Sequence, residues 1–192
     1  TSAGTTITGP LGPDGRPLVK IDFAGTSGGL TCIQLDAVGS RVIGLETVGC
    51  SNQPISMKAD DTQVAYCVLR GIGGVGPQCQ SATGGLFGPG NDVAGFTDGI
   101  QLKGPGCTVA SNHFHENATA ISVIVSAANA IILKNVIRDG GVGVRVLNTP
   151  GPKLYFNTLH GLSGSAITSN ASTPLEARNN LFTSGGACPF DG

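Results

Sequence analysis

The sequence is poor in aromatic and charged residues. It has no tryptophan, two tyrosines and seven phenylalanines, so few flat side chains are available for stacking on sugar rings. Only 12% of the residues are charged and the net charge is −1, which leaves no sequence-wide basis for binding nucleic acid or an anionic membrane surface. A membrane-spanning helix needs about 18 or more consecutive apolar residues. No run of that length occurs, so we expect no membrane span.

Several motifs for metal binding and catalysis are also absent. There is no CxxC pair and no Walker loop, and the string "GIGGVG" at residues 71–76, although its glycines have the spacing of a dinucleotide fingerprint, starts no plausible phosphate-binding helix and reads as loop. The six cysteines permit full pairing, which favours an oxidising, extracellular compartment. Cys79 and Cys188 lie in loop and tail sequence and are the better disulfide candidates. Cys67 and Cys107 occupy positions that suit buried free thiols.

The sequence does contain a repeat of about 22 residues. An Asn recurs at steps of 23, 22 and 23 residues, with apolar residues three before and two after it in most copies. The members of this series are Asn112, Asn135, Asn157 and Asn180. A second series of short apolar segments runs in phase with the first, centred on Ile33, Ile55, Ile100, Ile121, Val144 and Ile167. Each period therefore predicts two short strands.

Strands this short cannot bury their inner faces within one repeat, so each repeat must stack on the next. A parallel β-solenoid meets this need, with successive turns about 4.8 Å apart. In-register stacking also explains the Asn series, because each buried amide can pair with its neighbour one turn along. Clusters of glycine, of which the chain has 31, fall where each turn must bend.

Three strings carry a resemblance to a known family: "NHFHENATAISV", "NVIRDGGVGVRV" and "NTLHGLSGSAIT". They resemble the parallel β-helix repeats of the right-handed, pectate-lyase-like superfold, and the resemblance covers roughly residues 20–184. It implies an all-β protein, a right-handed single-stranded parallel β-helix of about seven turns with an internal Asn ladder.

We expect a single domain over residues 1–192, with a lead-in and cap at 1–25 and a tail at 185–192. Residues 71–98 are rich in Gly and Pro and interrupt the period, which predicts one long loop insertion beside the coil. Because long loops in compact folds are often functional, Asp92 and Asp98 in this segment become candidate binding residues.

Three residues beyond the Asn series lies an outward column of basic or potentially basic side chains. Its members are Arg70, His115, Arg138 and His160. One interpretation is a stripe that binds an acidic polymer such as a uronic-acid glycan. The alternative is a solvated edge whose charges are neutralised by Glu116 and Asp139.

The other predicted strand series carries Lys58, Lys103 and Arg145 on its outer face. In lyases of the superfold the substrate lies across such a face, so the resemblance suggests these residues as a catalytic base and its partners. A hydrolase would instead need two carboxyl groups about 5 to 9.5 Å apart; the regular turns offer no obvious pair, which leaves Asp92 and Asp98 in the insertion as the candidates. The alternative is a scatter of ordinary polar residues facing solvent.

The string "HFH" places His113 and His115 on one face of a strand, where Glu116 could complete a metal site. His160 lies two turns away, about 10 Å, and cannot share a metal with His115. Arg138 repels a cation. We therefore predict no metal and no cofactor, except for calcium if the protein is a lyase.

Within the superfold, the chain resembles bacterial secreted and surface β-helix repeat proteins more than a specific lyase family. We predict a secreted or cell-surface structural or adhesive β-helix whose flat faces bind a glycan or another copy end to end. The alternative is a carbohydrate-active enzyme, most plausibly a polysaccharide lyase acting on an acidic polysaccharide. The sequence alone leaves the question of enzymatic activity open.

Overall fold

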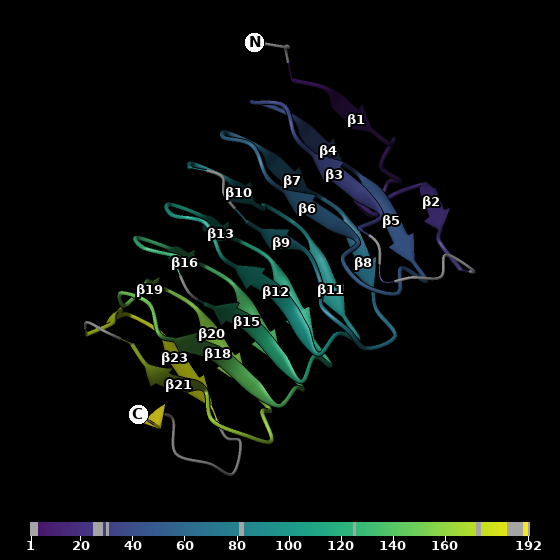
Figure 1. Cartoon of the computed structure of the whole chain (residues 1–192). Helices are drawn as coiled ribbons and strands as arrows, with labels where there is room; N and C mark the ends of the chain where they lie inside the picture. Colours follow the sequence, from purple (N-terminus) through teal and green to yellow (C-terminus); the bar gives the residue numbers. More distant parts are fainter. Residues whose placement is uncertain are drawn as a thin grey trace.

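The computed structural model describes residues 4–24, 29, 31–80, 83–124, 126–171, 174–183 and 190–191. Within these ranges the chain forms three eight-stranded parallel sheets and no helix. The strands stack as a parallel β-solenoid of about seven turns, which confirms the predicted fold class. Figure 1 shows the turns stacked along one axis, with the two termini at opposite ends.

We number the sheets in the order in which the chain enters them. Sheet 1 contains β1 (Thr6–Thr8), β4 (Arg41–Ile43), β7 (Gln63–Ala65), β10 (Leu86–Phe87), β13 (Thr108–Ala110), β16 (Ile131–Leu133), β19 (Lys153–Tyr155) and β22 (Glu176–Arg178). Sheet 2 contains β2 (Val19–Asp22), β5 (Leu45–Val48), β8 (Val68–Arg70), β11 (Asp92–Ala94), β14 (His113–His115), β17 (Val136–Arg138), β20 (Thr158–His160) and β23 (Leu181–Thr183). Sheet 3 contains β3 (Ile33–Leu35), β6 (Ile55–Met57), β9 (Gln78–Cys79), β12 (Asp98–Leu102), β15 (Thr119–Val123), β18 (Val142–Leu147), β21 (Ile167–Asn170) and β24 (Phe190–Asp191).

Each turn contributes three strands, one more than the sequence predicted. The two predicted series correspond to sheets 2 and 3. The apolar residue three before each Asn belongs to a separate strand of sheet 1: Ile132, for example, is the central residue of β16. A sharp corner, described below, separates this strand from the Asn, and a short apolar motif cannot reveal that corner.

The prediction of a long insertion at residues 71–98 is wrong. This segment is one further turn of the coil, with β9, β10 and β11 each paired to strands on both sides. The step of 45 residues from Cys67 to Asn112 therefore spans two periods, with Asn91 between them. Its Gly and Pro residues lie mainly between strands, and Gly84, Gly90 and Gly95 all have positive φ angles.

The hydrophobic core fills the inside of the coil. From β4 to β19, sheet 1 contributes an inward column whose members are each at most 1% exposed: Val42, Val64, Phe87, Val109, Ile132 and Leu154. Full burial of a side chain of this size contributes about 1.5–3 kcal/mol to stability. Because each inward residue packs on its equivalents one turn above and below, the core extends along the coil as one continuous cluster.

The predicted Asn ladder is confirmed, and Asn91 is a fifth member. The Asn135 Nδ2 donates to Asn157 Oδ1 at 3.0 Å and to the Val109 carbonyl at 2.9 Å. The Asn135 Oδ1 accepts from the backbone N and the Nδ2 of Asn112, at 3.0 and 3.1 Å. Both polar atoms of this buried amide are therefore satisfied.

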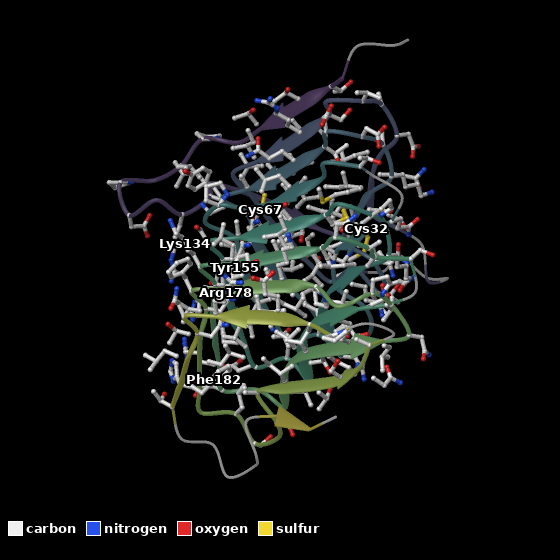
Figure 2. All side chains as sticks on the ribbon, turned by 90° about the vertical axis from the view of Figure 1, so that its left-hand side faces the viewer. Cys32, Cys67, Lys134, Tyr155, Arg178 and Phe182 are labelled. Carbon is white, nitrogen blue, oxygen red and sulfur yellow. A yellow bond between two sulfur atoms is a disulfide. The ribbon has the colours of Figure 1, made fainter. Side chains whose placement is uncertain are left out.

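The corner between sheets 1 and 2 is built by the residue before each ladder Asn. Ser111, Lys134, Phe156 and Asn179 have φ angles of 57°, 55°, 57° and 55°. This left-handed conformation turns the chain sharply, so that the Asn side chain points into the coil and the next strand starts in sheet 2. Figure 2 labels Lys134 at this corner.

Two disulfides join the described cysteines: Cys32–Cys50 and Cys79–Cys107. Cys79 is bonded as predicted, but the prediction of a free thiol at Cys107 is wrong. Cys79 points into the coil from β9, and its Cα lies 6.4 Å from that of Cys107, which is itself 1% exposed. Cys67 is a buried free thiol as predicted, and burial raises its pKa. Cys188 lies outside the described residues.

Candidate functional site

The outer face of sheet 2 gathers five ionisable side chains from four successive strands. We call them the histidine cluster: Arg70, Asp92, His113, His115 and Arg138. Alternation along each strand points these side chains outward. Register then places them side by side, because Asp92 pairs with His113, and His115 pairs with Arg138.

Asp92 is at the centre of the histidine cluster. Its Oδ1 lies 3.0 Å from His115 Nε2 and 3.4 Å from His113 Nδ1, while its Oδ2 accepts a hydrogen bond from Arg70. The two imidazole rings stack with centroids 4.9 Å apart. Arg138 donates from Nε to His113 Nε2 at 2.8 Å and also pairs with Asp139.

The cluster shifts the pKa values of two of its members. Burial acts to raise the pKa of Asp92, but the hydrogen bond and charge of Arg70, with the two histidines, outweigh it, and the pKa lies below its ordinary value. Burial lowers the pKa of His113; Asp92 opposes this effect, while Arg138 adds to it. At neutral pH the cluster therefore contains an ionised Asp92 and a neutral His113.

Four of the six predicted substrate-binding residues meet in this cluster: Arg70, Asp92, His115 and Arg138. His160 lies one turn beyond, paired in register with Arg138. Contrary to the prediction, the basic column is interrupted, because Ala94 stands between Arg70 and His115. Asp92 fills this gap from two residues away in the same strand.

Asp98, the sixth residue, lies on sheet 3 in a second polar arrangement. We call it the amide row: Gln78, Gln80, Asp98, Gln101, Ser122 and Arg145. Gln80 donates to Gln78 at 2.6 Å, Gln78 to Gln101 at 2.8 Å, and Gln101 to Asp98 at 2.6 Å. From the other side, Ser122 and Arg145 each donate to Asp98 Oδ1 at 2.7 Å.

Asp98 is 5% exposed and accepts hydrogen bonds from three side chains. Gln78 and Ser122 are also buried, whereas Gln80, Gln101 and Arg145 are partly exposed. The buried members therefore hold the accessible ones in fixed positions. Sequence reasoning missed Gln78 and Gln80 because it placed them in an insertion.

The three predicted catalytic residues do not converge. Arg145 is bound to Asp98 and Ser122 in the amide row. Lys58 and Lys103 stand in a neighbouring outward column, with Gln80 on the turn between them, as their backbone hydrogen bonds to successive turns show. Two turns correspond to about 10 Å between the two backbone positions.

Sheet 1 carries a smaller polar group near the C-terminal end. Tyr155 and Arg178 are paired in register, and the Arg178 Nε lies 2.7 Å from Glu176 Oε1. In Figure 2, Lys134, Tyr155 and Arg178 follow one another on successive turns of the coil. This group lies on a different sheet from both arrangements described above.

Three parallel sheets and an internal Asn ladder define the class of protein as a parallel β-solenoid. The chain belongs to the right-handed β-helix family, whose family model, described as a right handed beta helix region, matches residues 53–190. Searches of curated proteins and of solved structures find no match. Among the described residues, no helix is long and apolar enough to cross a membrane.

Proposed function

We propose that this protein is a secreted structural or adhesive β-helix that presents the outer face of sheet 3 to a glycan. The observation that carries the proposal is the amide row, which is hydrogen-bonded across four consecutive turns from β9 to β18. The two disulfides are typical of an oxidising compartment and support secretion.

The chemistry of the amide row suits a hydroxyl-rich ligand. Sugar hydroxyls both donate and accept hydrogen bonds, and the accessible members of the row offer amide and guanidinium groups for this purpose. Because the row is already ordered by its own hydrogen bonds, little side-chain entropy is lost when a ligand binds. A polymer lying along the coil axis would meet the accessible side chains of Gln80, Gln101 and Arg145.

The lyase hypothesis has less support. A lyase needs a base and charge-stabilising groups around one carbon atom, yet Lys58 and Lys103 are about two turns apart. Arg145 already bonds to the Asp98 carboxylate and the Ser122 hydroxyl. The arrangement therefore favours binding over proton abstraction.

A glycan array with neutral and acidic polysaccharides tests the proposal. Gln101→Ala interrupts the amide row, and we expect at least ten-fold weaker binding of any glycan that the native protein captures. Gln63→Ala on sheet 1 is the matched control and should bind normally. Equal binding by both variants would show that the amide row is not the site.

A parallel assay for newly formed unsaturated uronate, with and without calcium, tests the lyase alternative. Under our proposal no product forms from any acidic polysaccharide. Product formation that is lost in Lys103→Ala or Arg145→Ala would replace the binding proposal with the lyase.

A further inference from the structure

Three side chains of the histidine cluster bring potential metal ligands close together. Asp92, His113 and His115 each offer one potential ligand atom, and these three atoms all lie within 4.8 Å of one another. The sequence pattern suggested Glu116 as the partner of these histidines, because Asp92 was predicted to lie in an insertion. The coil instead places β11 next to β14, in register, and brings Asp92 to them.

The separations match those of metal ligands. Zinc binds imidazole nitrogen and carboxylate oxygen at about 2.0–2.1 Å, which places two ligands of a tetrahedral site about 3.3 Å apart. Asp92 Oδ1 lies 3.0 Å from His115 Nε2 and 3.4 Å from His113 Nδ1. Only the third separation, between the two imidazole nitrogens, needs a rotation of one ring to close.

We propose that Asp92, His113 and His115 bind a divalent transition metal ion, with zinc as the best fit. Two imidazoles and one carboxylate are a donor set that suits zinc and its borderline neighbours rather than calcium or magnesium. Three protein ligands leave a fourth position, which points away from the coil and is open to water or to an oxygen of a bound ligand.

Neighbouring groups are placed to support the ligands. Metal-binding carboxylates are commonly held by a second hydrogen bond, and Arg70 supplies one on the other oxygen of Asp92. The His115 Nδ1 is buried and has no hydrogen-bond partner among the described residues. When Nε2 binds the metal, Nδ1 carries the proton, and Glu116 Oε1 at 3.6 Å is the nearest carboxylate to accept it.

Arg138 opposes the metal and must move. It now donates to His113 Nε2, but coordination through Nδ1 places the proton on Nε2 and removes that acceptor. Asp139 already pairs with Arg138 and can hold it in the displaced position. Arg138 therefore reduces the affinity of the site, a property that can be tested.

Equilibrium dialysis against zinc chloride, after treatment with EDTA, tests the site in the intact chain. We expect one zinc ion per chain, at least ten-fold weaker binding in His115→Ala and in Asp92→Asn, and unchanged binding in His160→Ala. Cobalt in place of zinc should give the visible absorption of a tetrahedral site. No saturable binding, or equal binding in all three variants, would overturn the proposal.

The Arg138→Gln variant provides a second test, in which we expect zinc affinity to rise rather than fall. It removes a positive charge and supplies an amide oxygen that can accept the proton on His113 Nε2. We expect zinc to bind three-fold to ten-fold more tightly than to the native chain. Weaker binding in this variant would contradict the proposed coordination through His113 Nδ1.

Discussion

At Asn135 a polar side chain is required inside an apolar coil. Its amide contacts the turns on both sides, so Asn135→Leu removes partners from Asn112, Asn157 and the Val109 carbonyl at once. Each buried polar group left without a partner costs about 1–3 kcal/mol, and we expect a loss of about 3 kcal/mol in the free energy of unfolding. Equilibrium unfolding in guanidinium chloride measures this loss.

The matched control for Asn135 is Asn170→Leu. Asn170 is exposed, and its side chain accepts one bond from the backbone N of Asn148. We expect this variant to lose less than about 1 kcal/mol, because water replaces the bond. Equal losses in the two variants would mean that the ladder is not what stabilises the interior.

The charge on Asp92 makes stability depend on pH. Its pKa in the folded protein lies below the ordinary 3.8 because Arg70 and the histidines favour the ionised form despite burial. Its stabilising contribution is therefore complete above the ordinary value and is lost as the pH falls through the folded-state pKa. We expect Asp92→Asn to be less stable than the native chain at pH 6. Its stability should also fall less steeply as the pH is lowered.

Thermal unfolding by circular dichroism between pH 6 and about pH 2, in EDTA, checks the expectation for Asp92. The midpoints of the native chain and of Asp92→Asn should converge at the acid end. Curves that remain parallel over the whole range would show that the neighbours of Asp92 do not stabilise its ionised form.

The strand elements depend on the left-handed corners between sheets 1 and 2. Lys134 is exposed with a φ of 55°, a conformation that β-branched residues strongly disfavour. We expect Lys134→Val to lose about 1–2 kcal/mol of stability. Lys153→Val is the control, because Lys153 is exposed in β19, where an extended backbone suits valine.

Denaturant unfolding of both lysine variants distinguishes the effect of the corner conformation on stability from the effect of losing a charge. Each variant removes one exposed ammonium group, so a charge effect alone would give similar shifts. A Lys134→Val variant as stable as Lys153→Val would mean that the corner tolerates any residue.

The sequence predicted the strands of sheets 2 and 3 wherever the repeat was regular, but not the separate strands of sheet 1. Asn112, Asn135, Asn157 and Asn180 follow one another at steps of one period, and their position inside the coil follows from register alone. Asn91 was missed because the Gly and Pro around it hide a turn whose strands are only two or three residues long. The same omission separated Asp92 from His113, and a site formed between turns can be predicted only when every turn is counted.

At the scale of the whole molecule, a solenoid leaves two ends. Among the described strands, β1, β2 and β3 begin the three sheets, and β22, β23 and β24 end them, so each has one paired edge. Unpaired edges are sites for end-to-end association. Leu11 and Leu18 lie near the N-terminal end, 40% and 66% exposed, and add apolar surface there.

We expect the protein to associate end to end as its concentration rises, in keeping with a structural or adhesive role. Leu18→Lys places a charge at the N-terminal end and should shift the sedimentation profile toward the monomer. Ile72→Lys is the control, because Ile72 is 79% exposed but follows β8 partway along the coil. If Ile72→Lys alone abolished association, the contact would lie along the side of the coil and not at its end.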